Sequence, residues 1–268
     1  MEKQETFRRA VWRIAFPVTL QSLLQSSFSV IDQVMIGQLG SGSIAGIGLC
    51  GKFISVYSVV LAAVASAAGI MISQYMGAKD EDGIRRSFFT NLALSVGLAV
   101  VFLILCIAFP DCIMKIYTED PVTGNLAVQY IRIYALSFLP MAFTSILTTM
   151  LRCMDAAKLP LYASIFALVL NTGLNYMFIF GKWLFPEMGV RGAAAASVIA
   201  QVVSCCVIFV FFDRHIRKKK IPLSVFEFSR KKESYRTSGI FTGRMSRKNR
   251  SPFAVQKSGY RAQYFGIL

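Results

Sequence analysis

The sequence has few charged residues and few of the residue types that build metal centres or disulfide frameworks. Charged residues make up 16% of the 268 residues and hydrophobic residues 55%, whereas a soluble domain is nearer a quarter charged. The single histidine, His215, has no companion, and the six cysteines show no metal-ligand spacing. We therefore expect no metal site and no disulfide framework, and we interpret the cysteines as small apolar packing residues.

Acidic residues are scarce in the last part of the chain, which accounts for most of the formal net charge of +15. From Arg214 onward, 15 Lys and Arg face only Glu227 and Glu233, whereas residues 1–213 hold 14 Lys and Arg against 12 acids. A basic cluster directly after a membrane span attracts anionic lipid headgroups, at about 1 kcal/mol per charge. The tail carries no nucleic-acid recognition motif, so we expect lipid headgroups and no nucleic acid as its partner.

Long apolar blocks dominate the rest of the chain. A membrane-crossing helix needs roughly 20 mostly apolar residues, and the first block is too long for the apolar core of a signal peptide. Six blocks qualify, at about 14–36, 47–75, 87–109, 127–150, 159–181 and 191–212. Runs of small residues at 62–69 and 192–197 predict close contacts between helices. The sequence therefore predicts an all-α polytopic membrane protein, a bundle of six transmembrane helices.

Lys and Arg alternate between richer and poorer connections along the chain. The segment before the first block carries Lys3, Arg8, Arg9 and Arg13, and the loop around 37–45 carries no charge. Under the positive-inside rule this pattern favours both termini in the cytoplasm. We expect a lobe over 1–214 and a basic cytoplasmic tail over 215–268, in the plasma membrane, which in a bacterium is the inner or cytoplasmic membrane.

Asp32 is the carboxylate that lies well inside a predicted span, where an ionisable group suggests function. At 100° per residue, Gln21, Gln25 and Asp32 fall within roughly 40° of one another, so they form a polar stripe that must face protein or water. Two interpretations remain open. Asp32 is an interfacial residue held by nearby backbone groups, or it is a protonatable or cation-binding carboxylate in an outward-opening cavity.

Asn171 and Asn175 are four residues apart in the fifth block, so both project to one face of a helix. Buried amides in lipid seek partners across a helix interface. The spacing alone is compatible with two roles, which are adhesion between helices and binding of a substrate or an ion.

Four segments resemble the multidrug and toxic compound extrusion (MATE) family in order and spacing. Pro17 with 30–37 (VIDQVMIG) resembles its first helix, and 74–78 (QYMGA) resembles the end of its second. Residues 151–160 (LRCMDAAKLP) resemble its loop between helices four and five, and 171–175 (NTGLN) with 180–182, 186–190 and 192–194 resemble its fifth helix and the start of its sixth.

The resemblance implies a transporter rather than an enzyme, driven by protons or sodium, without an organic cofactor, that exports small organic cations. Asp32 matches the family's first-helix acid, which is implicated in cation coupling. Asn171 matches an asparagine that lines the same cavity, and Gln21 and Gln25 belong to the expected substrate cavity. Asn175 stands where some archaeal members carry a second acid, so Asp32 either does the coupling alone or shares it with the other lobe.

The family has two six-helix lobes, and alternating access moves one against the other, whereas this sequence ends after one. We therefore expect a truncated product, shifted out of frame near Ser234, that works with a second copy or a partner half. Two alternatives remain open: a membrane fragment unable to transport, and a flippase for lipid-linked polysaccharides.

Overall fold

The computed structural model describes residues 2–181 and 187–219, and within these residues it contains helices and turns but no strand. The elements are α1 (Glu2–Gly37), α2 (Ser41–Ala78), α3 (Glu81–Ala108), α4 (Pro110–Lys115), α5 (Pro121–Tyr134), η1 (Ala135–Ser137), α6 (Phe138–Cys153), α7 (Lys158–Ile179) and α8 (Gly189–Lys219). The predicted all-α bundle is confirmed. α8 continues past the predicted lobe boundary at 214, and the rest of the predicted tail, from 220, lies outside the described residues.

Five stretches of the described chain are long and apolar enough to cross a membrane: α2, α3, α7, α8, and α5 to α6 taken together. They correspond to five of the six predicted spans. α1, the first predicted span, is not among the five, but it is a long helix of 36 residues that packs against α7 and α2. The fourth span is interrupted by the 3₁₀ turn η1, which the sequence did not predict.

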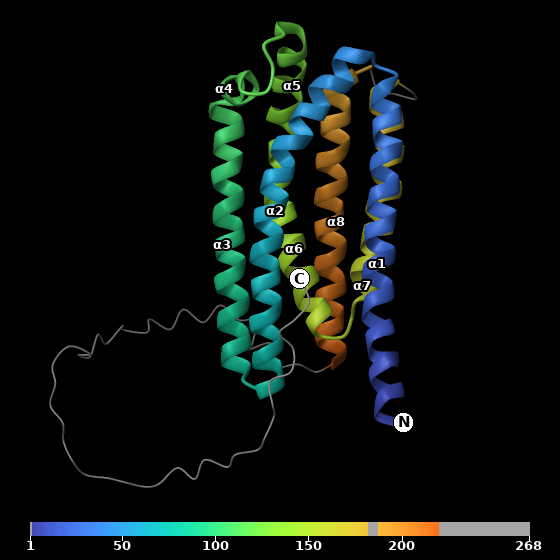
Figure 1. Cartoon of the computed structure of the whole chain (residues 1–268), viewed down its shortest axis with the longest axis vertical. Coiled ribbons are helices and arrows are strands. Elements are labelled where there is room, and N and C mark those ends of the chain that lie inside the picture. Colours follow the sequence, from blue (N-terminus) through green and yellow to red (C-terminus); the bar gives the residue numbers. More distant parts are fainter. Residues whose placement is uncertain (1, 182–186, 220–268) are drawn as a thin grey trace, which may run out of the picture. The chain divides into compact units, whose positions relative to one another are not determined.

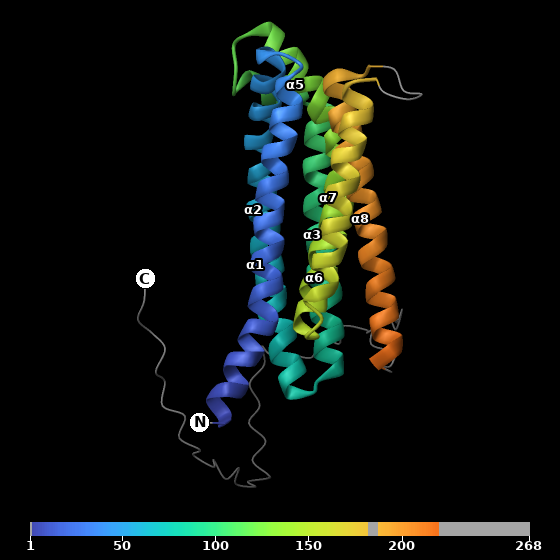
Figure 2. The same cartoon turned by 90° about the vertical axis from the view of Figure 1, so that its right-hand side faces the viewer.

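The long helices lie side by side, and the first residues of α1 lie at the same end as the last residues of α8 (Figure 1, Figure 2). This arrangement follows because α1, α2, α3, α5 to α6, α7 and α8 run in alternating directions, and an even number of passes returns the described chain to the end where it began. Which side of the membrane this end faces stays a prediction.

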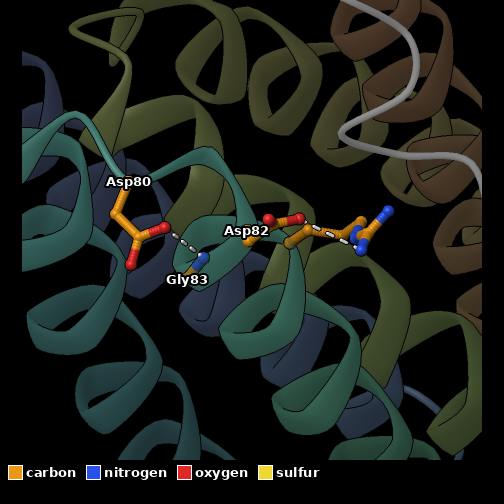
Figure 3. A network of polar contacts seen from close by, with 4 residues as sticks. Asp80, Asp82 and Gly83 are labelled. Atoms are coloured by element: carbon orange, nitrogen blue, oxygen red, sulfur yellow. Dashed lines mark hydrogen bonds and ion pairs between the residues drawn. The ribbon is translucent and has the colours of Figure 1, made fainter. Parts of the chain in front are cut away.

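Local polar contacts set where the helices begin. Lys79 adopts a left-handed conformation with φ of 57° that ends α2, and the Asp80 carboxylate accepts a hydrogen bond from the Gly83 N–H, at 2.9 Å, that caps α3 (Figure 3). The exposed Asp82 and the half-buried Arg85 form an ion pair in the first turns of α3, at 3.1 Å. Such a cap satisfies N–H groups that have no partner within the helix. Because α2 ends at Lys79 and α3 is capped by the next residue, the two helices join through a very short turn.

Asp120 caps α5 in the same way. Its carboxylate accepts hydrogen bonds from the Thr123 hydroxyl, from the Thr123 N–H at 3.0 Å and from the Val122 N–H at 3.3 Å. These three donors stabilise the ionised form, the Thr123 hydroxyl most, and hold the pKa of Asp120 below its usual value.

Aromatic side chains fill the centre of the bundle where α2, α3 and α6 meet. The Tyr57 ring lies 4.5 Å from that of Phe138 and 5.2 Å from that of Phe102, between ring centroids. Tyr57 is fully buried, and its hydroxyl donates to the Phe138 carbonyl at 2.9 Å. Burial of this hydroxyl is therefore matched by a hydrogen bond, as a membrane-spanning core requires.

The two small-residue runs have different roles. In α8, Gly192 lies so close to α7 that a Cβ added there would be 2.7 Å from the Phe178 carbonyl oxygen, which is the close contact that the run predicts. In α2, however, Ala62, Ser66 and Ala67 of the other run are exposed. On the opposite side of the same run, Ala68 is fully buried and a Cβ added at Gly69 would lie 3.2 Å from Thr149 on α6. The expected close contact is therefore present on one face of 62–69 and absent on the other.

Candidate functional site

Asp32 and the asparagines of α7 come together at the contact between α1 and α7. Asn175 is almost fully buried, with 1% of its surface exposed, and its side-chain N–H donates to Asp32 Oδ1 at 2.9 Å. Asp32 itself is half-buried. Its hydrogen-bond partners are thus amide side chains from another helix, which requires α1 and α7 to pack with these two faces opposed.

The Asn171 amide also faces Asp32. Because a carboxylate accepts hydrogen bonds, the Asn171 nitrogen must point toward it, and in that orientation it donates to Oδ1 at 3.2 Å and Oδ2 at 3.1 Å. The other end of the amide lies 3.5 Å from Ser197 Oγ on α8. Two amides therefore hold the carboxylate, and Asn175 Oδ1 remains buried without a hydrogen-bond partner.

Asp32 opens onto a cavity of about 550 Å³ between α1, α2, α5, α7 and α8, which we call the Asp32 cavity. Its lining includes Ser29, Asp32, Gln33, Lys52, Ser55, Tyr130, Asn175 and Ser197, with apolar residues of α1 and α2. Among the described residues that line this cavity, Asp32 is the acidic one and Lys52 is the basic one. The cavity therefore holds one charge of each sign.

Lys52 was not predicted as a site residue, because, of the ionisable residues within the predicted spans, only carboxylates were expected to be functional. Lys52 is the single charged residue of α2, twelfth from the helix start and so roughly 16 Å along it. A lone lysine inside an apolar block is the signal that would have found it, since an ionisable residue in a span suggests a function irrespective of its sign.

Gln21 and Gln25 lie in a different place. They line a second cavity of about 620 Å³, which we call the Arg152 cavity after the residue at its end. Gln21 is buried, donates to Ser164 Oγ at 2.7 Å and accepts from the Arg152 guanidinium at 2.9 Å. The predicted stripe does share one side of α1, but 11 residues, or roughly 16 Å, separate Gln21 from Asp32. The structure thus brings Asp32, Asn171 and Asn175 together and places the two glutamines elsewhere.

The sequence model of one family, MatE, matches residues 17–177, which is more than half of the chain. The chain belongs to the MatE family. This match covers α1 from Pro17 onward, with Asp32, and α7 up to Met177, with Asn171 and Asn175. The family resemblance seen in the sequence is therefore confirmed, and the members of the family are transporters rather than enzymes.

Curated MatE relatives are similar over most of this chain. A protein named "Probable multidrug resistance protein NorM" from Thermotoga maritima is 26% identical over 226 residues, which are 82% of this chain and 48% of that protein. The NorM protein of Streptococcus pneumoniae is 24% identical over 219 residues, and YoeA of Bacillus subtilis, also named a probable multidrug resistance protein, is 28% identical over 230. The chain spans about half the length of these relatives.

Solved structures of MatE-type transporters share the fold. One, described as the outward-facing conformation of a multidrug resistance MATE family transporter, has a TM-score of 0.70 at 24% identity and covers 76% of this chain and 45% of its own. A transporter from Pyrococcus furiosus, whose description states a reversed polarity of its binding pocket, gives the same values. The helices described here therefore form the fold of about half of such a transporter.

Proposed function

We propose that this chain forms one lobe of a cation-coupled exporter of small organic cations, with Asp32 as the group that exchanges the coupling ion for the substrate. The observation that carries this proposal is the Asp32 carboxylate, which is half-buried and open to a cavity, and which the nearly inaccessible Asn175 holds at 2.9 Å. A carboxylate placed in this way can receive a cation from the cavity without moving either helix.

Charge competition is the physical basis of the exchange. An ionised carboxylate attracts an organic cation, and it loses that attraction when it takes up a proton or a metal cation. A unit charge about 4 Å from Asp32 would gain about 4 kcal/mol at an effective dielectric constant of 20. One binding event at Asp32 therefore excludes the other, as antiport requires.

Oxygen atoms around Asp32 suit sodium as well as a proton. Hard cations bind carboxylate, carbonyl and hydroxyl oxygens. Asn175 Oδ1 is a buried acceptor without a partner, and Ser197 Oγ lies beside the Asn171 amide. These atoms would join the Asp32 carboxylate as ligands of a sodium ion, whereas a proton needs the carboxylate alone.

Transport by this mechanism requires a second bundle. Alternating access moves one helical bundle against another around a central site, and the described residues form one. We propose that the second bundle is another copy of this chain or a partner half. We also propose that both termini of this chain lie in the cytoplasm, where its basic residues lie near anionic lipid headgroups.

The test is accumulation of a fluorescent organic cation in cells that lack their own drug pumps and express the full chain. Wild type should lower accumulation, and Asp32→Asn, which keeps the size of the side chain, should not. Asp213→Asn is the matched control, because Asp213 is an acid at the far end of α8 that pairs with Arg217 at 2.9 Å, and it should behave as wild type. Equal accumulation in cells with wild type, with Asp32→Asn and without the chain would favour a fragment unable to transport.

A further inference from the structure

The Arg152 cavity is lined by hydroxyl and amide groups and by apolar side chains such as Leu61 and Met141, around one charged side chain. Its lining includes Gln21, Gln25, Ser58, Ser66, Thr144, Ser145, Thr148, Thr149, Arg152, Cys153 and Gln201. Among these described lining residues there is no carboxylate, so Arg152 has no counter-ion in the cavity. The electrostatics are thus opposite in sign to those expected of a site for organic cations.

Arg152 is held in place by a relay across three helices. From the last turn of α6 its guanidinium donates to Gln21 Oε1 on α1 at 2.9 Å, and Gln21 Nε2 donates to Ser164 Oγ on α7 at 2.7 Å. Because Ser164 occupies the Gln21 amide nitrogen, the amide oxygen faces the guanidinium. The orientation of Arg152 is therefore set by neutral groups, and no carboxylate among the described residues that line the cavity compensates its positive charge.

Part of the guanidinium lacks a partner. Arg152 Nε is sealed from solvent and has no hydrogen-bond partner in the structure, although an arginine presents five N–H donors in a planar fork that matches carboxylate and phosphate oxygens. A buried charge is costly unless it is paired. An anion that enters the cavity would supply the missing counter-charge to the guanidinium.

We propose that Arg152, positioned by Gln21, binds an oxyanion group, a phosphate or a carboxylate, that enters the Arg152 cavity. The hydroxyls of Ser145 and Thr148 lie in the wall of the same cavity as additional donors. The group can come from a lipid headgroup or from a free anion, and both present the same oxygens to the fork. This site does not depend on ion exchange at Asp32, so either proposal can fail alone.

Cys153 gives a local readout of occupancy. It lines the Arg152 cavity next to Arg152 and is half-buried, whereas Cys112 on α4 is exposed and does not line this cavity. The full chain would be placed in nanodiscs and treated with N-ethylmaleimide, and the alkylation rate of each cysteine would be followed by peptide mass spectrometry. Cys112 in the same sample is the internal control.

Two arms distinguish the sources of the oxyanion. In discs of neutral phosphatidylcholine, phosphate or acetate would replace chloride at equal ionic strength. In the other arm, phosphatidylglycerol would replace part of the neutral lipid without added phosphate. We expect alkylation of Cys153 to slow at least threefold in one arm or both while that of Cys112 stays constant. Slowing in the first arm identifies a free anion, and slowing in the second arm alone identifies a lipid headgroup.

Variants test whether Arg152 binds the anion that slows the alkylation of Cys153. Arg152→Gln should abolish the protection of Cys153 by the anion. Arg85→Gln, which removes a half-buried arginine paired with Asp82 on another part of the bundle, should keep this protection. Gln21→Glu keeps Arg152 and places a carboxylate at the atom that already contacts it, so Cys153 should become insensitive to the added anion. If Arg152→Gln fails to fold, the Gln21→Glu variant alone tests whether protection of Cys153 depends on Arg152. The proposal is overturned if Cys153 is not protected in either arm, or if protection persists in these two variants.

Discussion

Replacement of Gly192 by alanine should push α7 away from α8 and weaken the hydrogen bond from Asn175 to Asp32. The added Cβ would lie 2.7 Å from the Phe178 carbonyl oxygen and 2.9 Å from its carbon, whereas ordinary contacts begin near 3.4 Å. Both atoms belong to the backbone, so a rotamer change cannot relieve the clash. α7 must shift by roughly 0.7 Å at Phe178, which is one turn from Asn175.

The size of the effect follows from two opposing contributions. Overpacking of a well-filled contact costs about 1–3 kcal/mol, and alanine gains up to about 1 kcal/mol over glycine inside a helix. Gly173→Ala is the matched control on α7, because no heavy atom lies within 4 Å of its added Cβ. Both variants gain helix propensity, but only Gly192→Ala has the overpacking cost. The free energies of unfolding of the two variants should therefore differ by that cost, about 2 kcal/mol.

The assay is thermal unfolding of the purified full chain in detergent, followed by circular dichroism. At roughly 2–4 °C per kcal/mol for a chain of this size, Gly192→Ala should melt about 4–8 °C below Gly173→Ala. Organic-cation binding to Gly192→Ala should weaken too, because Asn175 moves with Phe178. Equal melting temperatures for the two variants would refute the close contact between α7 and α8.

Three further changes have outcomes set by single contacts. Lys52→Gln should raise the affinity for a monocationic dye about fivefold, because a like charge in the same half-solvated cavity costs about 1 kcal/mol; unchanged fluorescence polarisation would place Lys52 outside the field of Asp32. Tyr57→Phe should lower the free energy of unfolding by about 1 kcal/mol, because the Phe138 carbonyl loses a buried donor, and a denaturant titration measures it. Asp120 has a pKa below its usual value in the folded chain, so its contribution to stability is complete above the unfolded pKa and lost as the pH falls below about 4; the advantage of wild type over Asp120→Asn should shrink between pH 6 and pH 3 in thermal melts, and a constant difference would contradict the cap.

Much of the fold is predictable because lipid leaves few options for an apolar block of 20 residues. Blocks such as 47–75 and 159–181 became α2 and α7, with ends shifted by up to six residues. The break at η1 was not predicted, since hydropathy does not distinguish a 3₁₀ turn from a continuous helix. Family membership was predictable as well, because the motifs are short segments read directly from the sequence.

The site was predictable only in part, because it depends on which helices meet. Asp32, Asn171 and Asn175 follow from the rule that polar groups in a span seek one another. Helical periodicity placed Gln21 on the same side as Asp32 but gives no information on which neighbour each one meets along the helix. Arg152 was assigned to a loop, and its contact with Gln21, 131 residues away in the sequence, requires the tertiary structure.

The lone carboxylate of the Asp32 cavity sets the charge stoichiometry of any exchange that occurs there. If Asp32 alone exchanges the coupling ion for the substrate, as proposed, one proton or one sodium ion would be traded for one positive charge, so export of a monocation would be electroneutral and insensitive to the membrane potential. A dication would move one uncompensated charge outward against an inside-negative potential, at about 2.3 kcal/mol per 100 mV. An exporter with Asn175 in place of a second acid would therefore favour singly charged compounds in energised cells, and collapse of the potential would narrow that preference.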